Sequence, residues 1–261
     1  MKFVKYEGAG NDFILIDDRS AGFPVAERSL IQRLCHRQRG IGADGVLLLQ
    51  NSAGADFRMR IFNADGSEAE MCGNGIRCLV HFLRLLGYTH PVLRIETQSG
   101  VLSSQVVEGR DAICLGPVRR MHWDIELFDQ RLFVLDTGVP HAVLMGEEEV
   151  FGLAPKIRHA DLFAPKGVNV NVCQVLSEGV IRIRTYERGV EGETLACGTG
   201  CAAAAYVVTQ LFQWAFPVSV VTASGEVLKI CGQKQEELFM IGPVTPVFKG
   251  EIYDHWNSKR N

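Results

Sequence analysis

Two cysteines stand in the same tetrapeptide, Cys-Gly-x-Gly, which occurs at Cys72–Gly75 and again at Cys197–Gly200. Each copy is followed by an apolar run of helix-like composition, so each thiol is expected at a helix N-terminus. A free thiol titrates near pH ~8.5, and the N-terminal end of a helix lowers that pKa. If the two copies face each other, one thiol can act as base and the other as acid. That pair could remove a proton from one side of a carbon and return a proton to the other side.

The glycines of each tetrapeptide suit the same chemistry. They flank Asn74 and Thr199, where they let the backbone turn tightly and present N–H groups. Such N–H groups at a helix start bind an anion such as a carboxylate. Their dipoles would stabilise charge that builds on a substrate carboxylate as the carbon acid ionises. The alternative is that either cysteine is only a small residue that fits at a helix start.

A long internal repeat relates the two cysteines. Cys72 and Cys197 are 125 positions apart, and so are two Thr-x-Ser-Gly segments, while two Gly-Pro-Val segments are 126 apart: Thr97–Gly100 with Thr222–Gly225, and Gly116–Val118 with Gly242–Val244. Alternating strands precede both cysteines at a similar distance, at Phe57–Phe62 and Ile181–Tyr186. A period this long indicates two similar domains, because solenoid repeats are about 20–50 residues long.

The expected elements are many short strands with one long apolar helix in each half. Helices are expected at Val25–Arg37, Ile76–Leu86 and Ala202–Phe212. Strands are expected near residues 3–17 (a pair), 46–49, 57–62, 93–97, 101–107, 112–115, 132–136, 142–145, 169–175, 180–186, 218–222, 227–231 and 238–241. Strand–helix alternation of the doubly wound kind is missing. We predict an α/β fold of the α+β type, with a mostly antiparallel sheet wrapped around a central helix in each domain. The first domain is placed at 1–116 plus 246–261 and the second at 117–245.

Composition narrows the class of protein. The 261 residues are 47% hydrophobic and 22% charged, with a formal net charge of −3 and no basic stripe, so neither nucleic acid nor an acidic membrane surface is an expected partner. The N-terminus carries no signal-peptide apolar core. The longest apolar run, Cys201–Phe216, is interrupted by polar residues and is short of the roughly 20 residues of a membrane span. We therefore expect a soluble, cytoplasmic protein.

The eight cysteines are expected to be thiols, as is usual in a non-secreted chain of this size. A bridge between Cys72 and Cys197 remains an alternative in an oxidised sample. Zinc is not expected, since no Cys-x-x-Cys or matching His pair occurs. The segment Gly8–Gly10 lacks the third glycine of a dinucleotide fingerprint, and no lysine has a recognisable pyridoxal-phosphate context. The other six cysteines are expected in the core: Cys35, Cys78, Cys114, Cys173, Cys201 and Cys231.

Further polar residues end strands beside the two cysteine loops. They are Asn11, Asn63, Asn169 and the pair Glu187–Arg188. Asparagine at a strand end is often a plain turn residue, and the Glu–Arg pair could be a surface ion pair. Their shared placement just before the loops favours a role at the site. His141 follows a proline at a strand start and is a candidate for orienting or deprotonating a thiol.

Three segments resemble diaminopimelate epimerase: Gly8–Phe13, Glu70–Cys78, and Glu187–Gly189 followed by Glu193–Gly200. The resemblance covers nearly the whole chain, and the two cysteine motifs are specific. Proline racemases resemble it in their paired Cys-Gly loops, but their first loop typically carries His where this chain has Asn74. Phenazine-pathway isomerases of similar fold lack the cysteine pair.

The resemblance implies two pseudo-symmetric domains with the active site in the cleft between them, and a two-base reaction free of cofactor and metal. It implies that Cys72 and Cys197 are the acid/base pair and that His141 and Glu187 tune them. It also implies a homodimer, with Phe248 near the contact. Residues matching substrate-binding positions are Asn11, Asn63, Gly73, Asn74, Asn169, Glu187, Arg188, Gly198 and Thr199.

Two departures from the family pattern lie near these residues. Val139 stands where the family usually has Asn, in Gly138–His141, and Glu191 is one extra residue between Arg188 and Cys197. The first removes an amide that would contact substrate, although Glu191 or a water could replace that contact. The expected activity is epimerisation of LL-diaminopimelate to the meso form. The alternatives are an amino-acid racemase of broader specificity and a non-catalytic amino-acid-binding protein.

Overall fold

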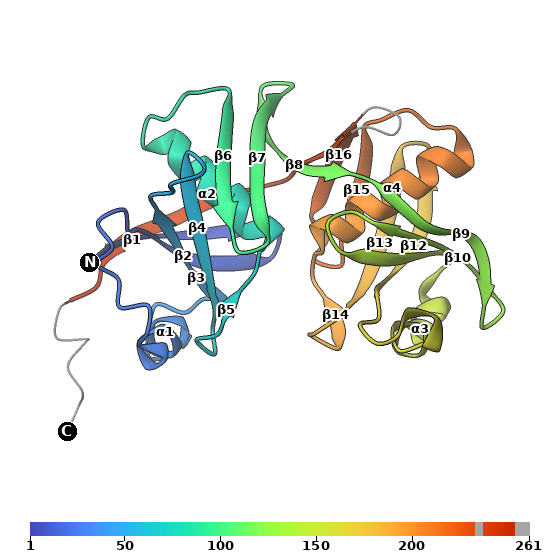
Figure 1. Cartoon of the computed structure of the whole chain (residues 1–261), viewed down its shortest axis with the longest axis horizontal. Helices are drawn as coiled ribbons and strands as arrows, with labels where there is room; N and C mark the ends of the chain where they lie inside the picture. The colour runs from blue at the N-terminus through green and yellow to red at the C-terminus, as the bar shows by residue number, and fades with distance from the viewer. Residues whose placement is uncertain (233–236, 254–261) are drawn as a thin grey trace. The chain divides into compact units, whose positions relative to one another are not determined.

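The computed structural model describes residues 1–232 and 237–253 (Figure 1). The chain forms two compact units: unit 1 is residues 1–113 with the segment from Val244 onward, and unit 2 is residues 114–243. The domain limits given above remain predictions, because these units are defined by contacts in the folded chain and not by independent folding.

Unit 1 is a sheet packed on the central helix α2. That helix, Gly73–Leu85, contacts β1, β2, β3 and β4. Strands β2 and β3, and likewise β4 and β6, pair in parallel, whereas the other pairs of this unit are antiparallel. The other elements are β1 Lys2–Gly8, β2 Asn11–Asp17, α1 Arg28–Cys35, β3 Gly45–Gln50, β4 Phe57–Asn63, β5 Glu68–Ala69, β6 Val92–Thr97, β7 Gly100–Val107, β18 Thr245–Glu251, and β8 Arg110–Pro117, which runs on into unit 2.

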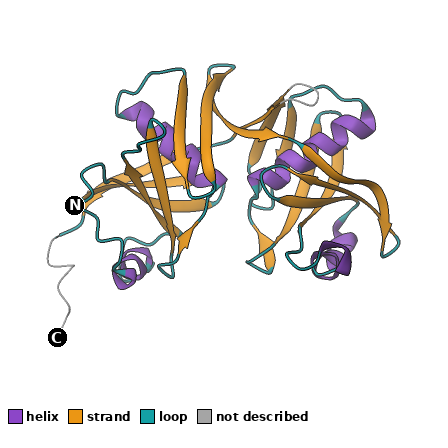
Figure 2. Ribbon diagram, viewed as in Figure 1, coloured by secondary structure: helices purple, strands orange, loops and turns teal. Residues whose placement is uncertain are grey.

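Unit 2 surrounds its own central helix more completely. Helix α4, Gly198–Phe212, lies among the strands of its unit (Figure 2), and every residue from Thr199 to Thr209 is buried. Four consecutive alanines, 202–205, let the strands approach this helix closely. The other elements are β9 Arg119–Leu127, β10 Gln130–Asp136, β11 Pro140–Met145, the 3₁₀ helices Glu148–Leu153 and Asp161–Phe163, α3 Ala154–Arg158, β12 Asn169–Ser177, β13 Val180–Glu187, β14 Gly192–Thr194, β15 Val218–Val221, β16 Val227–Gly232 and β17 Glu237–Ile241.

The repeat recurs in strand pairing and in side-chain contacts. The parallel pair β2–β3 matches β11–β12, and the antiparallel pair β3–β4 matches β12–β13. Equivalent salt bridges of 2.7 Å join an arginine of one strand to a glutamate of the short strand beside it. They are Arg60 of β4 with Glu68 of β5, and Arg184 of β13 with Glu193 of β14. The predicted fold class, two similar units each with a sheet around a central helix, is confirmed.

Strand β3 shows why an uninterrupted apolar run forms a central strand. Alternate residues of a strand point to opposite faces. Val46 and Leu48 belong to the buried cluster that includes the apolar face of α1. Leu47 points the other way and lies under Gly75 at the start of α2. Both faces of β3 are therefore covered by helices.

Several predicted boundaries need correction. The helix expected at Val25–Arg37 is only Arg28–Cys35, because residues 23–28 form short-range turns after Pro24. The two central helices begin earlier than predicted, directly after the cysteines. Strands β9 and β18 were not predicted. In β18 all residues but one are exposed, and the strand shows no apolar alternation. Strand β9 does alternate, with Trp123, Ile125 and Leu127 half-buried between exposed polar residues, but this signal in the sequence was not used.

Across the described part of the chain, every helix is too short or too polar to cross a bilayer.

Candidate active site

Cys72 is the N-cap residue of α2. Its backbone is extended (φ −145°, ψ 118°), and its Sγ accepts a hydrogen bond from the N–H of Gly75 at 3.4 Å. An N-cap side chain takes one of the N–H groups that a helix leaves without a partner. The hydrogen bond from the N–H of Gly75 stabilises the thiolate form of Cys72 relative to the thiol. A Cβ on Gly75 would stand 3.1 Å from the end of the Leu47 side chain, so a larger residue here would require Leu47 to shift by a few tenths of an ångström.

Asn74 is held in one orientation. Arg77 donates to its Oδ1 at 2.9 Å, so its Nδ2 is the group that donates to Oδ1 of Asn11, at 2.6 Å. Asn11 follows the two-residue turn Ala9–Gly10, both with positive φ, that joins β1 to β2. The structure therefore brings these two predicted substrate-binding residues into direct contact.

A charged network stands behind Asn11. Its Nδ2 donates to Asp44 at 3.1 Å, and Arg37 bridges Asp44 and Asp12 at 2.8 and 2.9 Å. Lys5, which is buried, also pairs with Asp12, at 2.6 Å. Burial alone would raise the pKa of Asp12, but the bonds from Arg37 and Lys5 outweigh it and lower the pKa to about 2. Sequence reasoning missed these four residues, since none lies in a cysteine motif.

The remaining predicted residues of unit 1 differ in their surroundings. Gly73 is the first residue of α2, next to Cys72. Asn63 ends β4 and is exposed, and its side chain donates to Ser67 at 3.0 Å, within the turn to β5. This contact fits the plain turn reading of Asn63 that the sequence left open.

Cys197 is the N-cap residue of α4, with extended backbone (φ −120°, ψ 106°), and is 9% exposed. Its Sγ lies 3.5 Å from Oγ1 of Thr199, and the same Oγ1 lies 2.9 Å from Nε2 of His141. Neither Gly198 nor Gly200 has room for a Cβ unless a neighbouring side chain shifts. A Cβ on the first would stand 2.6 Å from the sulfur of Met240, and one on the second would stand 2.3 Å from Oδ1 of Asn171.

His141 is fully buried, at the start of β11. Burial, and then the positive charge of Arg188, lower its pKa to about 3. At neutral pH the ring is therefore uncharged. It reaches Cys197 through Thr199 and not directly, so the structure gives it a relayed contact where the sequence suggested a direct one.

Glu187, Arg188 and Asn169 meet at the ends of β12 and β13. Oδ1 of Asn169 accepts the N–H of Arg188 at 2.8 Å, and Nδ2 of Asn169 donates to the carbonyl of Pro140 at 3.4 Å. Asn169 thus joins three strand ends. Burial raises the pKa of the Glu187 carboxyl. A carboxyl whose pKa is raised by burial is a frequent feature of catalytic sites.

The two departures from the family pattern have distinct surroundings. Glu191 has a positive φ of 55°, and its carboxylate accepts from Arg158 at 2.7 Å, from the N–H of Gly189 at 3.0 Å, and lies 3.2 Å from His159. These contacts hold the turn of the β13–β14 hairpin, and they engage the carboxylate that would have replaced the missing amide of Val139. Val139 itself is half-buried, next to Gly138 with φ 111°.

The six cysteines outside the two motifs are all buried, as predicted. Burial raises the pKa of Cys35 to about 11, and those of Cys78 and Cys173 to about 12. Such thiols stay protonated at neutral pH and are poor nucleophiles or bases.

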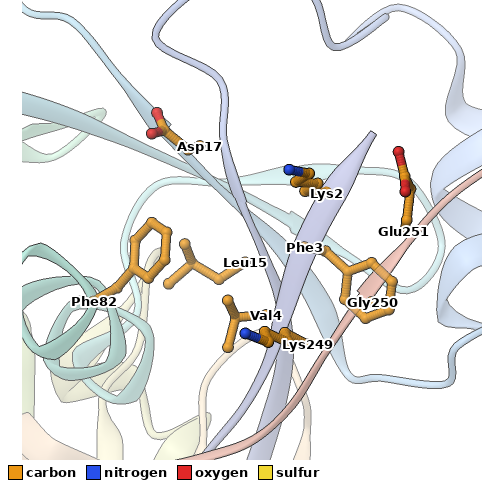
Figure 3. Close-up of a pocket in the computed structure, with 9 residues that line it drawn as sticks. All are labelled: Lys2, Phe3, Val4, Leu15, Asp17, Phe82, Lys249, Gly250 and Glu251. Atoms are coloured by element: carbon orange, nitrogen blue, oxygen red, sulfur yellow. The ribbon is translucent and has the colours of Figure 1, made fainter. Parts of the chain in front are cut away.

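A separate cavity of about 470 Å³ lies in unit 1, on strands β1, β2 and β18 beside Phe82 of α2 (Figure 3). None of its lining residues is a predicted site residue; they are Lys2, Phe3, Val4, Leu15, Asp17, Phe82, Lys249, Gly250 and Glu251. Within residues 1–232 and 237–253, no group of three or more His, Cys, Asp or Glu side chains is placed to hold a metal ion.

This chain matches a family profile and relatives that share one description. The profile of the family described as diaminopimelate epimerase matches residues 3–121 and 133–247. A diaminopimelate epimerase of Aquifex aeolicus is 41% identical over 97% of this chain and 98% of its own, and one of Methanothrix thermoacetophila is 42% identical over 97% and 96%.

Solved structures show the same fold at low sequence identity. A phenazine biosynthesis protein of the PhzF family from Bacillus anthracis has a TM-score of 0.71 at 15% identity, covering 97% of this chain and 99% of its own. A probable proline racemase from Agrobacterium radiobacter has a TM-score of 0.67 at 17% identity, covering 98% and 94%. With the family profile spanning both repeats and relatives matched along nearly their full length, this chain belongs to the diaminopimelate epimerase family.

Proposed function

We propose that this protein interconverts LL- and meso-diaminopimelate by proton transfer at one α-carbon, using Cys72 and Cys197 as the two bases. One observation carries the proposal: in a chain of this family, each cysteine caps the central helix of one of two repeated units. The same contacts could belong to a protein that only binds amino acids, and the experiment below separates the two.

The reaction requires one thiol on each face of the α-carbon. One cysteine, as thiolate, takes the α-proton, and the electrons of the broken C–H bond spread onto the substrate carboxylate. The other cysteine, as thiol, gives its proton to the opposite face, which inverts the configuration and leaves the two sulfurs with exchanged protonation states. Backbone N–H groups of Gly73, Asn74, Gly198 and Thr199 would stabilise the charge on the carboxylate.

The remaining predicted residues would bind the substrate or tune the acidity of the two cysteines. Asn11, Asn63, Asn169 and Arg188 are proposed to hold the polar groups of the substrate, with Glu187 next to the substrate ammonium. His141 and Glu187 are proposed to tune the cysteines. No step here calls for a cofactor or a metal, and we propose that the enzyme works without either in the cytoplasm, supplying meso-diaminopimelate to lysine and cell-wall synthesis.

Solvent exchange tests the proposal. Reduced protein incubated with LL-diaminopimelate in deuterium oxide should place deuterium at one α-carbon while meso product forms, which NMR and mass spectrometry both detect. A binding protein would bind without exchange. Protein alkylated with iodoacetamide is the control and should lose the exchange. If reduced protein exchanges no α-hydrogen of any amino acid tried, the catalytic proposal is wrong.

Val139 supports a second candidate, a racemase of broader specificity. One hydrogen bond to a charged group contributes about 1.5–3 kcal/mol, or roughly 10–150-fold in affinity. Since Glu191 is engaged by Arg158, it is a poor substitute for the missing amide. Turnover of LL-diaminopimelate and L-glutamate should be compared in the parent and in Val139→Asn. A shift of preference towards diaminopimelate in the variant supports the candidate, and an unchanged ratio removes it.

A further inference from the structure

A continuous line of buried hydrogen bonds runs to Cys197 from the strand behind it. Thr185 lies 2.9 Å from Oδ1 of Asn171, Nδ2 of Asn171 lies 3.0 Å from Nδ1 of His141, and His141 reaches Cys197 through Thr199. The residues of this line are at most 9% exposed, and His141 and Asn171 are fully buried. We call these five residues the Cys197 relay.

The direction of each bond follows from the groups that face it. Nδ2 of Asn171 also lies 3.3 Å from the carbonyl of Ala142, which can only accept, so this atom is the amide nitrogen. Oδ1 of Asn171 therefore accepts from the hydroxyl of Thr185. Because Nδ2 donates to His141, Nδ1 of the ring must accept. An uncharged imidazole carries one proton, which is then on Nε2 and is donated to Thr199.

The last bond of the relay depends on the state of the sulfur. Oγ1 of Thr199 accepts from His141, so its own proton is available to Sγ of Cys197 at 3.5 Å. A thiolate at Cys197 can only accept and gains this donor. A thiol at Cys197 can donate instead to the second lone pair of Oγ1, so the donor from Thr199 favours the thiolate most.

The equivalent positions of unit 1 are apolar. The paired residues Asn171 and Thr185 match Leu47 and Ile61, and the pairing of His141 with Asn169 matches that of Phe13 with Gly45. The glycines confirm the correspondence: a Cβ on Gly200 would meet Asn171, and a Cβ on Gly75 would meet Leu47. Unit 2 therefore buries three polar side chains at positions where unit 1 packs Phe, Leu and Ile.

We propose that Asn171 and Thr185 are positioning residues for Cys197, which set the proton of His141 on Nε2 and through Thr199 direct a hydrogen-bond donor at the sulfur. Resting on the proposed function, this makes the two thiols unlike: Cys72 takes its donor from the backbone of α2, and Cys197 takes one from a side-chain relay. Neither Asn171 nor Thr185 need touch the substrate.

The tautomer of His141 is the first measurement. Long-range ¹H–¹⁵N correlation spectra of ¹⁵N-labelled protein, with the ring assigned through His141→Gln, should show a protonated Nε2 and a bare Nδ1 in the parent. Asn171→Asp puts an acceptor where the amide donated, so Nδ1 should gain a proton. A protonated Nδ1 in the parent, or a bare Nδ1 in a folded Asn171→Asp protein, would overturn the proposal.

The second measurement is the reactivity of the sulfur. Asn171→Leu copies Leu47 and adds no charge; it removes the donor that keeps Nδ1 unprotonated, so the ring proton is no longer fixed on Nε2 and the donor to sulfur is weakened. Alkylation of Cys197 by iodoacetamide at pH 8, followed by peptide mass spectrometry, should slow by about 10-fold or more, the cost of one hydrogen bond to a charged group. Alkylation of Cys72 in the same sample should change less than about twofold.

Thr185→Val is the milder variant and should slow Cys197 in the same direction. Its matched control is Thr222→Val, which removes another buried, hydrogen-bonded threonine hydroxyl of unit 2 and should leave Cys197 unchanged. The proposal would be overturned if Thr185→Val and Thr222→Val slowed the alkylation of Cys197 equally. It would also be overturned if folded Asn171→Leu and Thr185→Val proteins alkylated Cys197 at the parental rate. Neither readout needs substrate, so these results stand or fall apart from the test of epimerisation.

Discussion

At the scale of single residues, position on the fold separates two cysteines from the other six. Both motif cysteines start a helix, and each has a hydrogen-bonding group within 3.5 Å of its sulfur. Buried thiols such as Cys78 and Cys173 have pKa values of about 12. The side chain is the same in every case, so location on the fold decides which thiols are suited to acid/base chemistry.

Removing either motif cysteine should abolish full epimerisation. Loss of one acid/base group typically costs on the order of 10²–10⁴-fold in rate, so Cys72→Ala and Cys197→Ala should each fall by that much. The serine variants should keep a little activity, because a hydroxyl can donate a proton but is a far poorer base. Cys114→Ala, a buried cysteine outside both motifs, is the control. Near-parental turnover in either motif variant would remove that residue from the mechanism.

The depressed pKa of His141 should make stability depend on pH. Its folded pKa is about 3, whereas an unfolded histidine titrates near ~6.5. The unfolded chain therefore binds the extra proton between these values, so this contribution to stability is complete above pH ~6.5 and is lost as pH falls towards 3. Urea unfolding of His141→Phe, which copies Phe13 of unit 1, should show a pH slope smaller than that of the parent by up to about 1.4 kcal/mol per pH unit between pH 4 and 6. Parallel slopes would contradict the buried, neutral ring.

The sequence was sufficient to predict the two thiols, because a repeated tetrapeptide with fixed spacing marks them. It did not single out Asn171 and Thr185, which lie inside strands where alternating polar residues are ordinary. Their signal is visible only after the two halves are aligned by strand register. Asn171 then aligns with Leu47, and Thr185 aligns with Ile61. A buried polar residue opposite an apolar counterpart is the pattern that finds them.

At the scale of elements, burial decided what could be predicted. The helices α2 and α4 carry long apolar runs and were recognised, although their first turns were missed because Gly-x-Gly has low helix propensity. Strand β18 was missed because nearly all of its residues are exposed, whereas β9 was missed although Trp123, Ile125 and Leu127 alternate with polar residues and pack inward. Helix α1 was predicted too long, since its flanks share its composition but bond as turns.

The β13–β14 hairpin gives a prediction about an element. Glu191 holds its turn by binding Arg158 and the N–H of Gly189, so Glu191→Ala should loosen the loop that carries Arg188. Trypsin should then cut after Arg188 several-fold faster, since local opening exposes the bond to the protease. The control is Glu178→Ala, in the exposed turn between β12 and β13, which should not change cutting at Arg188. An unchanged rate for Glu191→Ala would show that the turn is held by its backbone alone.

At the scale of the whole molecule, duplication gave two copies of one unit that have since diverged in their polar interiors. Salt bridges such as Arg60–Glu68 and Arg184–Glu193 kept their places. The strand residues next to each cysteine loop differ between the units: they are apolar in unit 1 and hydrogen-bonded in unit 2. Two similar units provide two thiols, and their differences allow each thiol a distinct environment.

Strand β18 provides an exposed surface through which two copies of the chain could associate. This strand pairs with β1 along one side, and all but one of its residues are exposed. Phe248 is 49% exposed, and its ring packs edge to face on Phe3 with the ring centroids 5.9 Å apart. Val247, 55% exposed, and the cavity beside Lys249 lie on the same strand. An edge strand with exposed apolar side chains can pair with another chain. This supports the homodimer that the sequence resemblance implies.

We expect the parent to have twice the chain mass of 28.8 kDa in solution, and Phe248→Asp to be a monomer. A charge buried without a partner at an interface of about 1,600 Å² is strongly unfavourable. Sedimentation equilibrium or light scattering measures this. Because Phe248 also packs on Phe3, circular dichroism should confirm folding, and Phe248→Ala provides a milder change that should weaken the dimer without adding charge. Leu176→Asp, at an exposed leucine of β12 in unit 2, is the control and should stay dimeric. A parent that is monomeric at micromolar concentration, or a folded Phe248→Asp protein that remains dimeric, would place the subunit contact elsewhere or remove it.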